Sequence, residues 1–149
     1  MSNIWEEFDK SVDIDGLISD AKEASENNLE FKEVTPGKYE VKVNKIELKK
    51  SKKNQPMVSI WFEILDGEFK GSLIFYNQVI SNGFGLHSAN VFLNSLDSGV
   101  EIIFKTFAQY HELLGDIFNA VDRNFEYILD YGQNSKGFNT YVIEDIFEV

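Results

Sequence analysis

Four lysines occur within five consecutive positions of the chain, and the tryptophan that follows them falls where the next strand is expected. These residues are Lys49, Lys50, Lys52, Lys53 and Trp61. Ammonium groups bind phosphate oxygens, and flat aromatic rings stack on nucleobases with about 1–3 kcal/mol per base. The two residue types together indicate contact with a single-stranded nucleic acid, whose bases are open to stacking. The alternative interpretation of the lysines is a solvated edge strand that its charges protect from aggregation.

The charge of the chain is divided unevenly along the sequence. The 149 residues carry a net charge of -11, yet residues 37–53 hold seven Lys and two Glu, a net +5. The flanking residues 1–36 and 54–149 carry -7 and -9. Such asymmetry indicates a partner for the basic segment. The acidic total disfavours a protein that coats duplex DNA by bulk charge, and the single arginine disfavours sequence-specific reading of guanine.

Alternating apolar residues predict five strands, and wider spacing predicts two helices between the third and fourth strands. The strands are expected at 39–48, 57–65, 72–80, 125–131 and 138–147, and the helices at 86–97 and 106–122. The apolar parity shifts between Val43 and Ile46, which predicts a β-bulge in a long, bent first strand. In the second strand Trp61 lies opposite the aliphatic face. In the third strand the pattern leaves open whether Phe75 or Tyr76 points inward.

This element order matches the OB-fold, a five-stranded antiparallel barrel with a helix between its third and fourth strands. We therefore expect a mainly β (α+β) protein with an OB-like barrel, N-terminal helices and a helical insertion. Residues 1–30 are expected to form an N-terminal helical extension and residues 31–149 the barrel domain, together a single domain. A generic α+β sandwich is the alternative architecture.

OB folds bind ligands on the face of strands two and three, flanked by the loops after strands one and four. On this frame the expected nucleic-acid-binding residues are Lys49, Lys50, Lys52, Lys53, Trp61, Phe69, Tyr76 and Lys136. Trp61 is expected to stack a base, helped by Tyr76 or Phe75, and the lysines to hold phosphates. The alternative for Trp61 is packing beneath the N-terminal helices, and a lone lysine such as Lys136 is common in hairpin loops.

Catalytic chemistry has little support in the sequence. The absence of Cys excludes a disulfide scaffold, a thiolate zinc site and a Cys nucleophile. His87 and His111 have no partner at metal-ligand spacing, and Gly83-Phe84-Gly85 lacks the third glycine of a dinucleotide fingerprint. We expect no enzyme, no cofactor and no metal site, with a metal-dependent or carboxylate-only enzyme as the alternative. Since no long apolar run and no secretory signal pattern occurs, a soluble intracellular protein is expected.

Three segments of the chain resemble a known family. They are residues 35–43 (TPGKYEVKV), 51–58 (SKKNQPMV) and 62–71 (FEILDGEFKG). In these segments the chain is similar to a phage-encoded domain-of-unknown-function family akin to phage OB-fold single-stranded-DNA-binding proteins. The likeness covers the layout of residues 1–149 and is sharpest over 35–77. It implies a role in phage DNA replication or recombination, in the cytoplasm of a bacterial host, and supplies no binding residues.

The resulting expectation is a sequence-nonspecific, non-catalytic single-stranded-DNA-binding protein, with phage recombination or replication proteins as further partners. The alternative is an acidic protein–protein interaction module that docks on a phage or host protein, as the acidic flanks suggest. Self-association is left open, with Ile4, Trp5 and Phe8 as candidate contact residues. The acidic C-terminus continues a strand pattern, so we expect a strand there and not a flexible recruiting tail.

Overall fold

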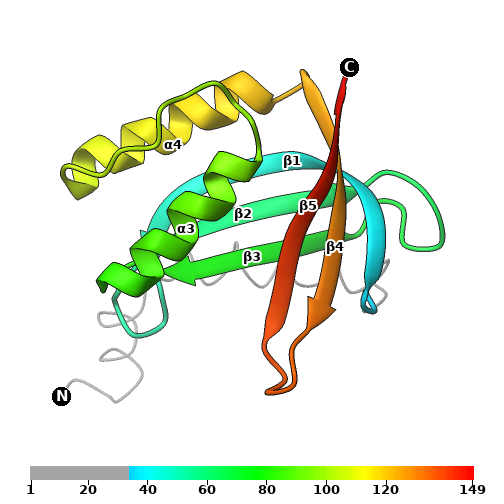
Figure 1. Cartoon of the computed structure of the whole chain (residues 1–149), viewed down its shortest axis with the longest axis horizontal. Helices are drawn as coiled ribbons and strands as arrows, with labels where there is room; N and C mark the ends of the chain where they lie inside the picture. Colours follow the sequence, from blue (N-terminus) through cyan, green and yellow to red (C-terminus); the bar gives the residue numbers. More distant parts are fainter. Residues whose placement is uncertain (1–33) are drawn as a thin grey trace, which may run out of the picture. The chain divides into compact units, whose positions relative to one another are not determined.

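The computed structural model describes residues 34–149, which form five strands and two helices. The elements, in chain order, are β1 (Gly37–Lys50), β2 (Pro56–Ile64), β3 (Leu73–Val79), α3 (Gly83–Ser95), α4 (Phe107–Val121), β4 (Phe125–Gln133) and β5 (Asn139–Glu148) (Figure 1). Each element predicted from the apolar pattern of this region is confirmed, with ends shifted by a few residues. The predicted N-terminal extension, and with it Ile4, Trp5 and Phe8, lies outside the described residues.

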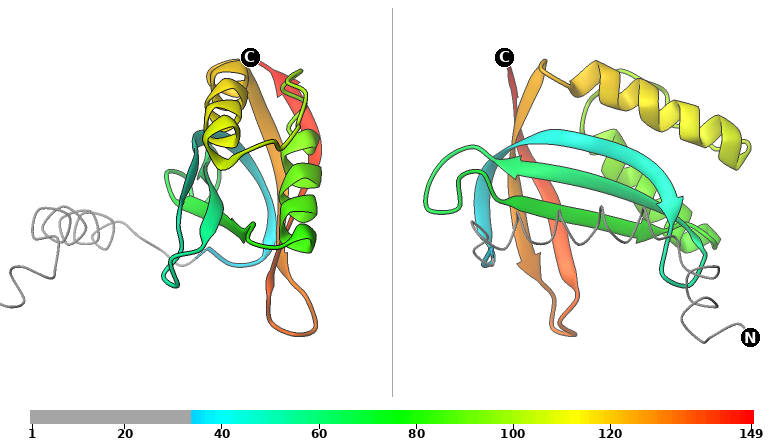
Figure 2. Two further views of the ribbon diagram at one scale, coloured as in Figure 1. Left: turned by 90° about the vertical axis from the view of Figure 1, so that its left-hand side faces the viewer. Right: turned by 180° about the vertical axis from the view of Figure 1, so that it is seen from behind.

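The five strands form one antiparallel sheet in the order β3-β2-β1-β4-β5. β1 is shared by both halves of this sheet, because residues 37–41 pair with β4 and residues 41–50 pair with β2. Its register shifts between Val43 and Lys45, so the bulge predicted from the parity change is confirmed. The bend allows β2 and β3 to run across the direction of β4 and β5 (Figures 1 and 2).

The strands β3 and β5 are the two edges of the sheet, and within residues 34–149 no backbone ladder joins them. A side chain connects them instead, since the Tyr141 hydroxyl donates a hydrogen bond of 2.6 Å to the carbonyl oxygen of Phe75. The structure thus shows an open, five-stranded antiparallel sheet with two helices. The predicted number of strands, their antiparallel arrangement and the helix positions are confirmed, whereas closure of the sheet into an OB-like barrel stays a prediction.

The inner face of the sheet is covered by the two helices. The aliphatic face predicted for β2 is fully buried, and it consists of Val58, Ile60, Phe62 and Ile64. From α3, the ring of Phe92 lies edge-on to Phe62 with centroids 6.1 Å apart. α4 packs against β1 through a buried stripe at helical spacing: Tyr110, Leu113, Leu114, Ile117 and Val121. Burial of each such side chain contributes about 1.5–3 kcal/mol.

The start of each helix is held by a side-chain cap. Asn82 accepts a hydrogen bond of 2.7 Å from the Gly85 amide, and Thr106 accepts one of 3.0 Å from the Gln109 amide. The first turn of α3 also sits very close to the end of β3. A Cβ atom at Gly85 would lie 2.2 Å from the Val79 carbonyl oxygen, so a glycine is required for this approach. In this region no helix is long and apolar enough to cross a membrane.

Candidate nucleic-acid interface

The outward side chains of β1, β2 and β3 form a surface that we call the Trp61 face. Its members are Lys45, Glu47, Lys49, Trp61 and Phe75, whereas Ser59, on the same side of β2, is fully buried. The strand register places Lys45 opposite Trp61 and Trp61 opposite Phe75, so three side chains form one row across three strands. The Lys45 ammonium lies 4.7 Å from the Trp61 ring centroid, and the Phe75 ring lies edge-on to Trp61 at 5.4 Å. The row therefore combines a cation with two aromatic rings.

Sequence reasoning did not select Lys45, although a signal for it was present. The bulge at Asn44 moves the following residues onto the opposite parity, so Lys45 joins the Trp61 face. The orientation of the side chains in the third strand also alternates, since Phe75 is 38% exposed and Tyr76 is 6% exposed. Tyr76 therefore points into the core, and it is Phe75 that lies beside Trp61. This corrects the expectation that placed Tyr76 on the ligand face.

Acidic side chains moderate the charge of the Trp61 face. The Glu47 carboxylate lies 3.3 Å from the Lys45 ammonium and 3.9 Å from that of Lys49. Beside them, Lys42 and Glu63 form a further pair at 3.6 Å. Exposed ion pairs contribute only about 0–1 kcal/mol, so these lysines can exchange a carboxylate for a phosphate at little cost.

The β1–β2 loop is a short, pinned turn that carries the lysine cluster. The Ser51 hydroxyl accepts hydrogen bonds from the Lys53 amide at 3.3 Å and the Gln55 amide at 3.1 Å. The Asn54 amide donates to the Ser51 carbonyl at 2.9 Å, and Asn54 has a positive φ of 61°. Lys50, Lys52 and Lys53 are exposed and make no ion pair within residues 34–149. The loop thus presents cations from a fixed backbone.

The β4–β5 loop is pinned in a similar way and extends to the same side of the molecule as the β1–β2 loop, the lower side of Figures 1 and 2. The Asn134 side-chain oxygen accepts hydrogen bonds from the Lys136 amide at 2.9 Å and the Phe138 amide at 3.1 Å. Lys136 is exposed, as expected for a loop residue, and Phe138 is 67% exposed. Sequence reasoning missed Phe138 because it was assigned to the following strand.

One predicted site residue is not brought together with the others. Phe69 lies in the β2–β3 turn, half-buried, with its ring edge-on to Tyr39 at a centroid distance of 5.9 Å. This turn and the lysine loop lie at opposite ends of β2 (Figure 1). Phe69 therefore packs against the core, away from the lysines. The alternative in which N-terminal helices cover Trp61, itself half-buried, concerns residues outside the described part.

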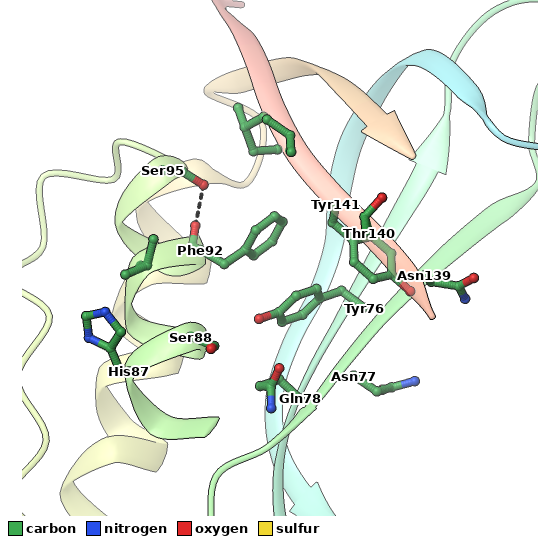
Figure 3. A pocket seen from close by; sticks show the side chains of 13 residues that line it. Tyr76, Asn77, Gln78, His87, Ser88, Phe92, Ser95, Asn139, Thr140 and Tyr141 are labelled. Atoms are coloured by element: carbon green, nitrogen blue, oxygen red, sulfur yellow. Dashed lines mark hydrogen bonds between the residues drawn. The ribbon is translucent and has the colours of Figure 1, made fainter. Parts of the chain in front are cut away.

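A pocket of about 610 Å³ lies between β3, α3 and β5, on the side where the two edge strands separate (Figure 3). Its apolar wall contains Tyr76, Phe92 and Tyr141; the Tyr76 ring stacks on Phe92 at 4.3 Å and meets Tyr141 edge-on at 5.1 Å. Burial raises the pKa of both the Tyr76 and Tyr141 phenols, so both are neutral hydrogen-bonding groups near pH 7. No site residue from the sequence other than Tyr76 lines this pocket.

Comparison with known proteins found a match to one family model. A family model described as "Protein of unknown function (DUF669)" matches residues 20–88. Within the described part, this match spans β1, β2, β3 and the first turns of α3, and so contains the Trp61 face and the lysine loop. The predicted likeness to a domain of unknown function is confirmed to this extent. No curated protein matches the chain.

The histidines and carboxylates of residues 34–149 do not form a metal-binding cluster, because no group of three or more of them is arranged to hold an ion. His111 is exposed on α4, and His87 is exposed on α3 at the margin of the pocket.

Proposed function

We propose that this protein is a non-catalytic, sequence-nonspecific single-stranded-DNA-binding protein. The observation that carries the proposal is the row of Lys45, Trp61 and Phe75 across three strands, with the lysine loop at the end of the same strands. Trp61 and Phe75 stack bases, and the lysines hold the phosphates that connect them. Because stacking uses the π-face that every base possesses, this arrangement binds without reading sequence.

The topology supports an OB-like barrel as the scaffold for this activity. β1 bends and pairs in both halves of the sheet, and the helices stand between β3 and β4, as the OB plan requires. The hydrogen bond between Tyr141 and the Phe75 carbonyl brings β5 against β3, where an OB barrel closes. On this plan, the Trp61 face and the two pinned loops correspond to the ligand surface.

The resemblance to phage proteins extends the proposal to a biological role. The match to a family of unknown function includes the segments on which that resemblance rests. We propose a role in phage DNA replication or recombination, in the cytoplasm of a bacterial host, with proteins of the same processes as partners.

A binding panel tests the proposal. The purified chain is titrated at low salt with unlabelled oligo-dT and oligo-dA, a single-stranded RNA and a duplex of equal length. Single strands of either DNA sequence should bind with similar affinity and the duplex more weakly. Affinity should fall with salt with a slope of about -0.7 per phosphate contacted. No binding to any single strand at low salt would overturn the proposal.

The alternative function is a module that docks on a phage or host protein. Its specific support is Phe84, which is 84% exposed at the start of α3. This alternative predicts that no oligonucleotide binds, and that Phe84→Ser abolishes association with a defined replication or recombination protein in a purified mixture.

A further inference from the structure

The pocket between β3, α3 and β5 continues the row of the Trp61 face. Phe75 ends that row on β3, and the next two residues along the strand, Tyr76 and Asn77, line the pocket. From the other edge, Tyr141 lines the pocket and donates its hydrogen bond to the Phe75 carbonyl. A strand of DNA that stacks on Trp61 and Phe75 therefore reaches the mouth of this pocket at the edge of β3.

The lining of the pocket selects a neutral, hydrogen-bonding ligand. None of its described lining residues is Lys, Arg, Asp or Glu, so it offers no strong attraction for a phosphate. Its polar groups are the imidazole of His87 at the margin and a set of amides and hydroxyls, which include Gln78, Ser88 and Asn139. Asn and Gln side chains present a donor and an acceptor together, which is the pattern found on the edges of nucleobases.

Tyr76 offers a hydrogen-bonding group to a ligand in the pocket. Its side chain is 6% exposed, yet its hydroxyl makes no hydrogen bond to any residue of the described part. Figure 3 shows this hydroxyl directed toward α3, on the side of Ser88, while the Tyr141 hydroxyl points the other way. Because this hydroxyl belongs to a residue that lines the pocket, it is available to form a hydrogen bond with a group of the ligand.

We infer that this pocket holds one unstacked nucleobase of the bound strand, an inference that rests on the proposed function. The volume of about 610 Å³ lies in the range of small-molecule sites and exceeds the needs of a single base. The base leaves the row after Phe75 and lies along the apolar wall. Its polar edge faces the Tyr76 hydroxyl and the amides, and the adjoining phosphate lies toward Lys136 in the β4–β5 loop.

Filling the pocket tests this inference. Ser88→Phe places a ring in the pocket, and Asn94→Phe places the same ring on an exposed position of α3 that does not line it. Each variant is titrated with oligo-dT that carries one 2-aminopurine, whose fluorescence reports the surroundings of that base. Ser88→Phe should weaken binding by about 5- to 100-fold and abolish the fluorescence change, as loss of one bound base predicts. Asn94→Phe should bind as the unmodified chain does.

A further variant keeps the outcomes distinct. Tyr76→Phe removes only the hydroxyl, so it should lower affinity without altering the circular dichroism spectrum, even where Ser88→Phe fails to fold. Equal affinity of all three variants and the unmodified chain would overturn the base pocket, leave the proposed function standing and favour a protein ligand for the pocket. If the unmodified chain binds no oligonucleotide, both the pocket and the proposed function are contradicted.

Discussion

At the scale of single residues, the interface depends on how β1 places Lys45 relative to Trp61. A cation over an aromatic face contributes about 0.5–1 kcal/mol at exposed sites, so Lys45 helps to fix the indole orientation before any ligand arrives. Phe75 supports the other edge of the ring. An aromatic row held in this way loses little side-chain freedom on binding, which favours stacking of bases.

Removal of the second ring of the row tests its role. Phe75→Ala should weaken binding of oligo-dT by about 1–3 kcal/mol, because one stacked base loses its platform. Phe107→Ala is the matched control, since Phe107 is similarly exposed but lies at the start of α4. Fluorescence anisotropy of a labelled oligonucleotide measures both. Equal losses for the two variants would exclude Phe75 from the site.

Removal of one acidic charge from the Trp61 face should strengthen oligonucleotide binding, whereas removal of a ring weakens it. Glu47 lies between the ammonium groups of Lys45 and Lys49, so Glu47→Gln should strengthen binding and steepen its salt dependence. Glu126→Gln on β4 provides a charge-matched control. A weakened affinity in Glu47→Gln would show that the carboxylate positions the lysines, and would contradict the exchange of carboxylate for phosphate on this face.

At the scale of elements, the approach of α3 to β3 shapes both the core and the pocket. The contact depends on Gly85, where a methyl group would meet the backbone of Val79. Gly85→Ala should destabilise the fold by about 1–3 kcal/mol, because a backbone atom cannot move aside as a side chain can. Gly83→Ala, with open space around its Cβ position, should be neutral or slightly stabilising. Urea unfolding measures both, and equal midpoints would contradict the close packing of α3.

Buried tyrosines connect the helices to the sheet and set the response to alkaline pH. Tyr110 donates a hydrogen bond of 2.6 Å to Asn90, and burial raises its pKa to about 12. A phenol with a raised pKa contributes stability below its unfolded pKa, near 10, and this contribution is lost as pH rises toward 12. Thermal melts at pH 8, 10, 11 and 12 should show this loss. Tyr110→Phe should be less stable at pH 8, and its melting temperature should fall less steeply as the pH rises. An equally steep fall would contradict the raised pKa of Tyr110.

Much of the fold can be predicted from periodicity, because half-buried strands and amphipathic helices place apolar residues at regular spacing along the sequence. The bulge near Asn44, the buried face of β2 and the stripe of α4 were all predictable in this way. The orientation of Phe75 and Tyr76 was not, since both faces of β3 carry apolar residues. The pocket was also beyond sequence reasoning, because Tyr76, Ser88 and Asn139 meet only through tertiary packing.

At the scale of the whole molecule, the proposed function predicts from the charge distribution which nucleic acid is favoured. The net charge of -11 opposes broad contact with a duplex, while the segment 37–53 with its net +5 supplies a short cationic surface. On the proposed function, the row, the lysine loop and the loop with Phe138 together bind one strand. We therefore expect the acidic surroundings to increase the preference for single strands over duplexes.

The lysine loop should account for a measurable share of the salt dependence. Replacement of Lys49, Lys50, Lys52 and Lys53 by Ala should reduce the salt slope by about 0.7 for each phosphate that is no longer bound. Lys70→Ala combined with Lys105→Ala removes cations that lie outside the loop and should leave the slope unchanged. An unaltered slope in the loop variant would remove these lysines from the interface.

The most direct test of the central claim follows Trp61 itself. In a Trp5→Phe background Trp61 is the sole tryptophan, so its fluorescence reports only the proposed face. Titration with unlabelled oligo-dT at low salt should quench this fluorescence saturably, and added salt should reverse the quenching. A tryptophan signal that stays unchanged while the oligonucleotide binds would place the site elsewhere, and absence of binding would contradict the proposed function as a whole.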